Sequence, residues 1–129
     1  MNIPENVKLY EHAIATFWFD EDGILYSVSK KVPRDVEVMK DYVIFVKKML
    51  NNNKACILSD ISNAAPMDKN TRDYIETELK NVYKAMALIS KSPLGIMIAN
   101  IYLKLNTPSF PTKMFANVKD GKNWLKQYL

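Results

Sequence analysis

The polar side chains best placed for chemistry or recognition lie between residues 57 and 75, where an apolar run gives way to a polar loop. Asp60 ends the apolar run, and Asp68 stands at the start of a segment with helical spacing. A helix start presents unpaired N–H groups and a partial positive charge, which together can hold an anion or a phosphorylated side chain. Such a loop is a catalytic site, a surface that docks a partner, or a plain connection.

Catalysis has little support in the residue types of this chain. His12 is the one histidine and has no identifiable nucleophile as a partner, and Cys56 is the one cysteine and lies inside an apolar run. Histidine and cysteine clusters that could hold a metal are absent from the sequence, as are the GxxxxGK[ST] and GxGxxG patterns that bind phosphates. We therefore expect no catalytic residue, no metal and no cofactor, and a protein that is not an enzyme.

A docking surface is the functional interpretation of the loop, and ordinary helix capping by Asp68 is the alternative. Lys69 and Arg72 add positive charge to the helix start, whereas Asp60 repels an anion. Loops at the carboxyl ends of parallel strands are where α/β sheets usually bind ligands and partners. The candidates for docking a protein partner are Asp60, Ser62, Asn63, Asp68, Lys69, Asn70, Thr71 and Arg72.

Composition limits the kind of molecule that carries this loop. With 129 residues, 48% of them hydrophobic, the chain is long enough for one well-buried core, so we expect a single domain over residues 1–129. The net charge of +4 comes from scattered lysines, so nucleic acid is not an expected partner. The apolar stretch at 93–105 is shorter than the roughly 20 residues that cross a bilayer, and the polar N-terminal region lacks a signal core. We expect a cytoplasmic protein without a transmembrane segment.

The spacing of apolar residues predicts an opening hairpin followed by alternating helices and strands. Strict alternation indicates strands at 12–19 and 24–29, joined by a tight turn at Asp22 and Gly23. Further strands are expected at 55–61, 85–90 and 113–117, and helices at 33–50, 68–82, 93–105 and 120–128, with Asp68, Ser92 and Asp120 as N-caps.

This order, β-β-α-β-α-β-α-β-α, predicts an α/β fold. Because crossovers between parallel strands are right-handed, the strands after the hairpin should be parallel, with the first strand antiparallel at or near one edge. Helices should cover both faces of the sheet. The strand at 55–61 then lies in the middle of the sheet, and the loop after it lies at the rim.

The helix expected at 93–105 is apolar on almost every side, although a helix that covers a sheet needs only one apolar face. Three interpretations stay open: burial between the sheet and its neighbours, a surface for self-association or a partner, and one wall of a pocket for an apolar ligand. The candidates for such an interface or ligand site are Ile98, Ile101, Tyr102 and Leu105.

The order of elements over most of the chain, with a loop at a strand end before the second helix, resembles the STAS domains of anti-sigma-factor antagonists, also called SpoIIAA-like, and so does one local motif. Residues 60–63, Asp-Ile-Ser-Asn, are similar to the family's Asp-Leu-Ser-Gly, and Met67 with Asp68 match the start of its Met-Asp-Ser-Ser-Gly. The resemblance then ends, because Lys69 and Asn70 stand where the family has two serines, the second of which is phosphorylated. Thr71, which stands where the family has glycine, is a substitute hydroxyl whose phosphorylation the sequence leaves open.

Over its whole length the chain resembles uncharacterised bacterial proteins described as STAS/SEC14-like, through segments that include GILYSV, ISKSPLG, NIYLKLNTPSFPTKMF and WLKQYL. This resemblance implies the SpoIIAA-like fold and no established activity. Together these features predict a non-enzymatic module for protein–protein interaction in bacterial regulation, with a homodimer as one form of partnership. The alternative is a carrier or sensor of a small apolar, lipid-like ligand held between the helix at 93–105 and the sheet.

Overall fold

The computed structural model describes the backbone of residues 1–129 and every side chain except that of Tyr102. Within it the chain forms one six-stranded sheet whose strands follow the order of the sequence. The strands are β1 (Tyr10–Glu11), β2 (Ala15–Phe19), β3 (Leu25–Ser29), β4 (Ala55–Asp60), β5 (Tyr83–Ile89) and β6 (Thr112–Phe115). The helices are α1 (Val36–Met49), α2 (Lys69–Leu79), α3 (Pro93–Leu105) and α4 (Val118–Leu125), which a short 3₁₀ turn at Lys126–Tyr128 extends.

The pairing of the strands confirms the predicted mixed sheet. β2 pairs antiparallel with both β1 and β3, whereas β3, β4, β5 and β6 pair in parallel. The two-residue β1 was not expected, and it occupies the edge beside β2. β2 begins at Ala15 rather than at His12, because the backbone N–H of His12 donates to the carbonyl of Ala15 in a turn that separates β1 from β2.

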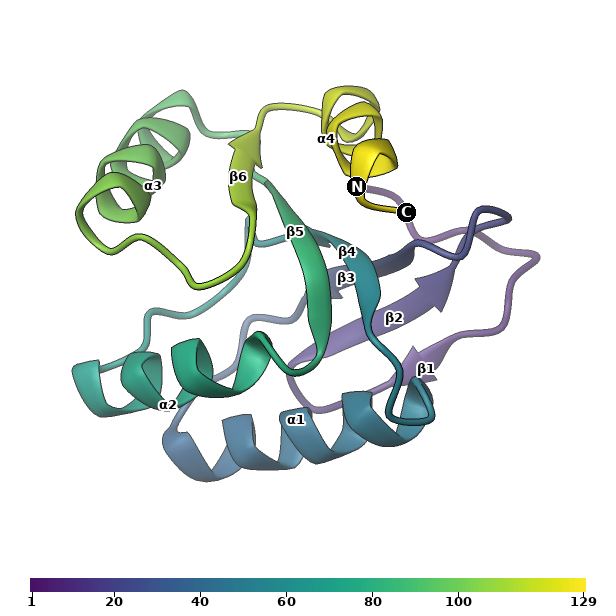
Figure 1. The fold of residues 1–129 in the computed structure, drawn as a ribbon, viewed down its shortest axis with the longest axis horizontal. Helices are drawn as coiled ribbons and strands as arrows, with labels where there is room; N and C mark the ends of the chain where they lie inside the picture. Colours follow the sequence, from purple (N-terminus) through teal and green to yellow (C-terminus); the bar gives the residue numbers. More distant parts are fainter.

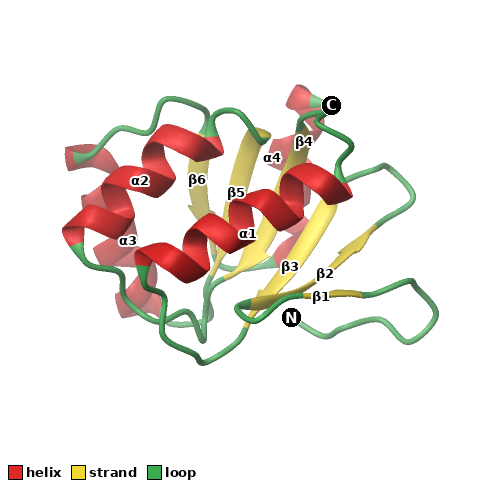
Figure 2. Ribbon diagram, turned by 90° about the horizontal axis from the view of Figure 1, so that it is seen from below, coloured by secondary structure: helices red, strands yellow, loops and turns green.

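Helices cover both faces of the sheet, as predicted. α1 and α2 lie side by side on one face, and α4 lies on the other (Figures 1 and 2). α3 lies beside β6, at the edge of the sheet opposite β1 (Figure 1). The core is accordingly divided into one cluster beneath α1 and α2 and a second cluster beneath α4.

The alternation of side chains along β3 and β4 explains this division. Ile57 points toward the α1–α2 face, whereas Cys56 and Leu58 point toward α4. Both sets are buried, because parallel strands covered by helices have no solvent face. On β3, Leu25 and Tyr26 divide between the two clusters in the same way.

The helix starts follow the predicted capping chemistry with one exception. The carboxylate of Asp68 accepts from Thr71 N at 2.8 Å, and the hydroxyl of Ser92 accepts from Gly95 N at 3.1 Å. The prediction of Asp120 as the cap of α4 was wrong: Asn117 is the cap, and its side chain accepts from Asp120 N at 2.9 Å. Asp120 instead accepts from the Asn117 amide, because it stands three residues after the cap, where a carboxylate reaches back to it.

Candidate functional site

The predicted docking loop connects β4 to α2 at the carboxyl edge of the sheet. Asp60, at its start, is only 5% exposed and accepts hydrogen bonds from Ser62 N at 2.9 Å and from the Met1 amino group at 2.7 Å. Burial alone would raise the pKa of Asp60, but these donors hold that pKa below its usual value. The carboxylate therefore organises the start of the loop from inside, and it is not available as a docking residue.

Thr71 is also buried, with 1% of its surface exposed, in the first turn of α2. Its backbone N–H is held by the Asp68 cap. A partner or a kinase could not reach its hydroxyl unless the first turn of the helix opened. The structure therefore removes Thr71, like Asp60, from the exposed part of the candidate surface.

The remaining loop candidates lie together at the rim of the sheet. Ser62, Asn63, Asp68, Lys69 and Asn70 are exposed. Lys69 lies 2.8 Å from Asp73, and the half-buried Arg72 donates to the carbonyl of Met67 at 2.7 Å. We define the rim as these five exposed residues together with Arg72. Lys69 is exposed but paired with Asp73 of the same helix, and Arg72 is hydrogen-bonded to the loop that precedes α2.

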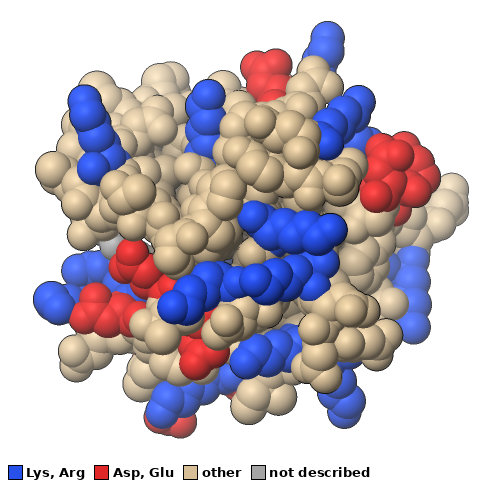
Figure 3. Space-filling view, in the orientation of Figure 1, with Lys and Arg blue, Asp and Glu red and all other residues tan. Residues whose placement is uncertain are grey.

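α3 carries an exposed apolar stripe, which we define as Leu94, Met97, Ile98, Ile101 and Leu105. Each of these side chains is between 54% and 78% exposed, and their spacing places them along one side of the helix. Figure 3 shows few charged side chains over this part of the molecule. Burial is therefore the wrong interpretation for Ile98, Ile101 and Leu105, while the side chain of the fourth candidate, Tyr102, lies outside the described residues.

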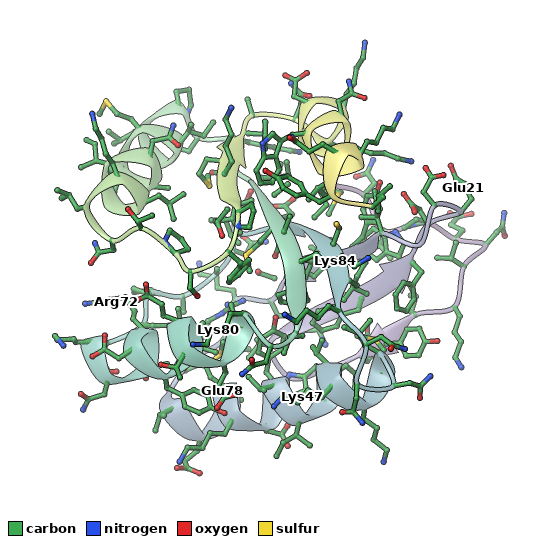
Figure 4. All side chains as sticks on the ribbon, viewed as in Figure 1. Glu21, Lys47, Arg72, Glu78, Lys80 and Lys84 are labelled. Carbon is green, nitrogen blue, oxygen red and sulfur yellow. The ribbon has the colours of Figure 1, made fainter. Side chains whose placement is uncertain are left out.

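A groove of about 170 Å³ connects the rim to α3. Arg72 and Ile75 of α2 line one side, and Leu103 of α3 with Phe110 of the following loop lines the other. Figure 4 shows Arg72 on the side of α2 that faces α3. The groove therefore adjoins the rim at Arg72 and α3 at Leu103, which lies on the side of α3 opposite the exposed stripe.

A larger cavity, of about 250 Å³, lies beneath α1 and α2 against the sheet. Its walls are mostly apolar, and small residues make the space: Ser27 and Ser29 of β3, Ser59 of β4, and Ala64 and Ala65 of the loop. The sequence analysis did not predict it. The available signal was the pattern LYSVS and ILSD, in which serines take positions that face the helix layer.

Arg34, which the sequence analysis did not select, lies at one end of this cavity. One of its terminal nitrogens donates to the hydroxyl of Ser29 at 3.0 Å, and its Nε is buried without a hydrogen-bond partner. Among the described side chains no carboxylate forms an ion pair with it, and burial lowers the pKa of its guanidinium. Arg34 also lines a surface hollow formed with Lys31, Ala65 and Asp68, so it stands between the cavity and solvent.

The other polar groups of the cavity satisfy one another. The hydroxyls of Ser27 and Ser59 lie 2.7 Å apart, and the hydroxyl of Tyr42 is hydrogen-bonded to that of Tyr83. Burial raises the pKa of Tyr42 to about 12, although its bond to Tyr83 opposes this, so the phenol is neutral at ordinary pH. Arg34 is therefore the one described group at this cavity that brings an uncompensated charge.

His12 and Cys56, the two residues considered for catalysis, take part in the packing and hydrogen bonding of the fold. His12 accepts from Ile14 N through Nδ1 at 3.2 Å, and its Nε2 lies 2.7 Å from Asp41. Burial raises the pKa of the Cys56 thiol, which lies beneath α4. Within the described residues there is no group of three or more histidine, cysteine, aspartate or glutamate side chains that could hold a metal ion, and no helix is long and apolar enough to cross a membrane.

Comparison with known proteins places the chain in a family. Its residues 17–129 match the family described as "Domain of unknown function (DUF7793)". The chain belongs to this family. A search of curated proteins finds no match. The DUF7793 chain is similar in structure to an uncharacterised protein of the DUF3478 family from Shewanella loihica PV-4, which is described as having a SpoIIAA-like fold.

That similarity has a TM-score of 0.54 and extends over 96% of this chain and 99% of the other, at 15% sequence identity. At this identity it establishes the fold and nothing about activity. The SpoIIAA-like fold that the order of elements and the motif at residues 60–68 implied is therefore confirmed. The finer resemblance to a SEC14-like branch has no support from the comparisons.

Proposed function

We propose that this DUF7793 chain is a non-enzymatic, cytoplasmic module that binds a protein partner through the rim and the apolar stripe of α3. The exposure of that stripe is the observation that carries the proposal. Five large apolar side chains on one side of a helix stabilise nothing while they face water, and contiguous exposed patches of this kind mark sites of protein association.

The rim adds the polar part of the proposed interface. Protein interfaces combine an apolar centre with a polar border, and the groove between α2 and α3 adjoins the rim at Arg72 and meets α3 at Leu103, on the side opposite the stripe. An apolar side chain of the partner would enter the groove against Ile75 and Leu103. Backbone groups of the partner would meet the amides of Asn63 and Asn70.

A role in bacterial regulation rests on the resemblance of residues 60–63 and 67–68 to STAS motifs. The rim lies after β4 and at the start of α2, where the serines of those motifs stand. Because Lys69 and Asn70 replace these serines, we propose constitutive docking rather than a serine phosphorylation switch. The absence of catalysis stays an expectation, supported by the structural partners of His12 and the burial of Cys56.

Affinity capture with matched variants tests the proposal. The tagged chain is compared with Ile98→Glu/Ile101→Glu in the stripe, with Lys69→Glu/Arg72→Glu at the rim, and with Ile44→Glu, which alters an exposed apolar residue of α1. We expect one stoichiometric protein partner with the unaltered chain and with Ile44→Glu, and its loss with both double variants at unchanged circular dichroism. Equal recovery with all four proteins would overturn the proposal.

Light scattering separates a partner from a second copy of this chain. If the stripe mediates a homodimer, the unaltered chain is dimeric and Ile98→Glu/Ile101→Glu is monomeric. If the chain is monomeric in both forms, the captured protein is the occupant of the stripe.

The alternative of an apolar ligand between α3 and the sheet does not match the position of the larger cavity. That cavity lies beneath α1 and α2, and of these two spaces it is the smaller groove that reaches α3, at Leu103. The ligand hypothesis therefore has to be argued from a different part of the molecule.

A further inference from the structure

The cavity beneath α1 and α2 combines apolar walls with one cation at its outer end. We infer that it binds a small monocarboxylate with an aliphatic tail, with the tail among the apolar walls and the carboxylate against Arg34. This inference does not rest on the exposed stripe of α3, because no stripe residue lines the cavity, although Ile75 lines both the cavity and the groove.

The volume sets the size of the tail. Well-packed interiors leave few voids larger than a water molecule, and a cavity of about 150 Å³ lined by apolar side chains is enough for benzene. Because about 150 Å³ holds the six carbons of benzene, the 250 Å³ beneath α1 and α2 holds a chain of roughly eight to ten carbons. Ile57, Ile75 and Leu79 would surround the aliphatic tail of the ligand with apolar groups.

The position of Arg34 sets the head group. A guanidinium presents several N–H donors in a planar fork, and one of the donors of Arg34 is already used on Ser29 while Nε is buried and unpaired. An unpaired charge at a low-polarity site is costly unless an opposite charge meets it. A carboxylate is the simplest group that both offers this charge and accepts from a planar fork.

The neighbouring acids favour a single negative charge over a larger anion. Asp35 and Asp68 line the surface hollow outside Arg34, and both are engaged as helix caps, through Val38 N and Thr71 N. A dianionic phosphate extending into that hollow would approach both carboxylates. A carboxylate seated deeper, at Arg34, avoids them.

The surface hollow supplies a route to the cavity. Arg34 and Ala65 line both spaces, so a ligand that enters between the β3–α1 connection and the β4–α2 loop passes the guanidinium first. Its head group would then remain at the carboxyl ends of β3 and β4, where α/β sheets usually bind ligands. Met67 and Met86 line both the cavity and the groove beside α3, and these flexible side chains permit tails of different length.

Calorimetric titration with octanoate tests the inference on the full chain after denaturation and refolding to remove bound lipid. Octanol serves as the probe with the same tail and no charge. Arg34→Met removes the cation and keeps the apolar stem, and Lys31→Met removes a neighbouring exposed cation that lines the outer hollow but not the cavity. A second variant, Ala64→Leu, fills the cavity from the loop.

We expect the unaltered chain and Lys31→Met to bind octanoate alike, and Arg34→Met to bind it roughly ten- to a hundred-fold more weakly. Arg34→Met and the unaltered chain should bind octanol with the same affinity. Ala64→Leu should lower the affinity for both octanoate and octanol. Failure of the unaltered chain to bind octanoate at millimolar concentration would overturn the inference. If Arg34→Met bound octanoate as tightly as the unaltered chain, the proposed role of the cation would be wrong. Ala64→Leu tests the cavity even if Arg34→Met does not fold.

Discussion

Lys122 connects the opening hairpin to the last helix. Its ammonium group lies 3.0 Å from Asp20 and 3.1 Å from Asp22, at the turn where Gly23 adopts a positive φ of 79°. Burial by itself would raise the pKa of Asp20, but the hydrogen bonds from Lys122 and from two backbone N–H groups lower it. The turn thus combines glycine geometry with a partly buried ion pair that joins the hairpin to the last helix.

This arrangement predicts a pH-dependent effect of Lys122→Met. A carboxylate whose pKa is lowered in the folded state adds stability above its unfolded pKa of about 3.9, and this stability is lost as the pH falls through the folded value. We expect Lys122→Met to reduce the free energy of unfolding at pH 7, with a difference from the unaltered chain that shrinks below pH 4. Urea denaturation at pH 7 and pH 3 measures the two differences.

Lys119→Met is the matched control, because Lys119 is exposed on the same helix. It should change the free energy of unfolding little at either pH. A deficit of Lys122→Met that stays constant between pH 7 and pH 3 would show that its packing, not its charge, matters.

Arg34 and Asp120 show where residue-level inference from the sequence stops. The capping preferences of Asp68 and Ser92 are local, so the sequence was sufficient to predict them. For α4 the same preference was satisfied three residues earlier, by Asn117, because both residue types cap helices and the spacing alone does not choose. Arg34 follows no motif, and its importance comes from contacts across the fold.

At the scale of elements, α3 and α4 illustrate two different uses of the apolar side chains of a helix. α4 packs closely on the sheet: a Cβ added at Gly121 would stand 3.0 Å from Ile89 and 3.4 Å from Leu58. α3 instead contacts β6 and leaves its stripe exposed. The sequence predicted that α3 is apolar on nearly every side, but which of its sides faces water depends on its position at the edge of the sheet.

The two helices should respond differently to truncation. Leu125→Ala, at a fully buried position of α4, should lower the free energy of unfolding by about 2–5 kcal/mol, because it leaves a cavity in the core. Ile98→Ala in the exposed stripe should change the free energy of unfolding by less than about 0.5 kcal/mol. Denaturation in urea at low protein concentration measures both.

A large cost for Ile98→Ala would contradict the exposure of the stripe in the isolated chain. If that cost grew with protein concentration, a second copy would be covering the helix. Leu125→Ala provides the reference, since its cost should not depend on concentration.

At the scale of the whole molecule, the spacing of apolar residues was sufficient to predict the arrangement of strands and helices. The change from alternating to helical spacing identified the hairpin, the three later strands and the four helices, and handedness rules then gave the parallel region. The edge strand β1 was missed because two residues are too few to show a period. The cavity was missed because it arises from small residues on three separate segments, β3, β4 and the loop, that meet only in three dimensions.

The hydroxyl pair of Ser27 and Ser59 connects this cavity to the stability of the fold. The two oxygens lie 2.7 Å apart and come from neighbouring strands. Removing one partner leaves the other hydroxyl without its bond, whereas replacing both with apolar groups removes the polar requirement altogether. We therefore expect Ser27→Ala and Ser59→Val each to lower the free energy of unfolding by roughly 1 kcal/mol. The double variant should lower it by at least about 1 kcal/mol less than the sum of these two changes.

A double-mutant cycle in urea measures this interaction energy, and octanoate titration of the same four proteins shows its consequence for ligand binding. Valine at position 59 occupies space in the cavity, so the double variant should bind octanoate more weakly. Its stability should recover at the same time, since sites that bind ligands are often not optimised for stability. Additive costs would mean that the two hydroxyls find other partners in solution. Unchanged octanoate affinity in the double variant would mean that the tail does not reach β4, and would restrict the ligand to the region around Arg34.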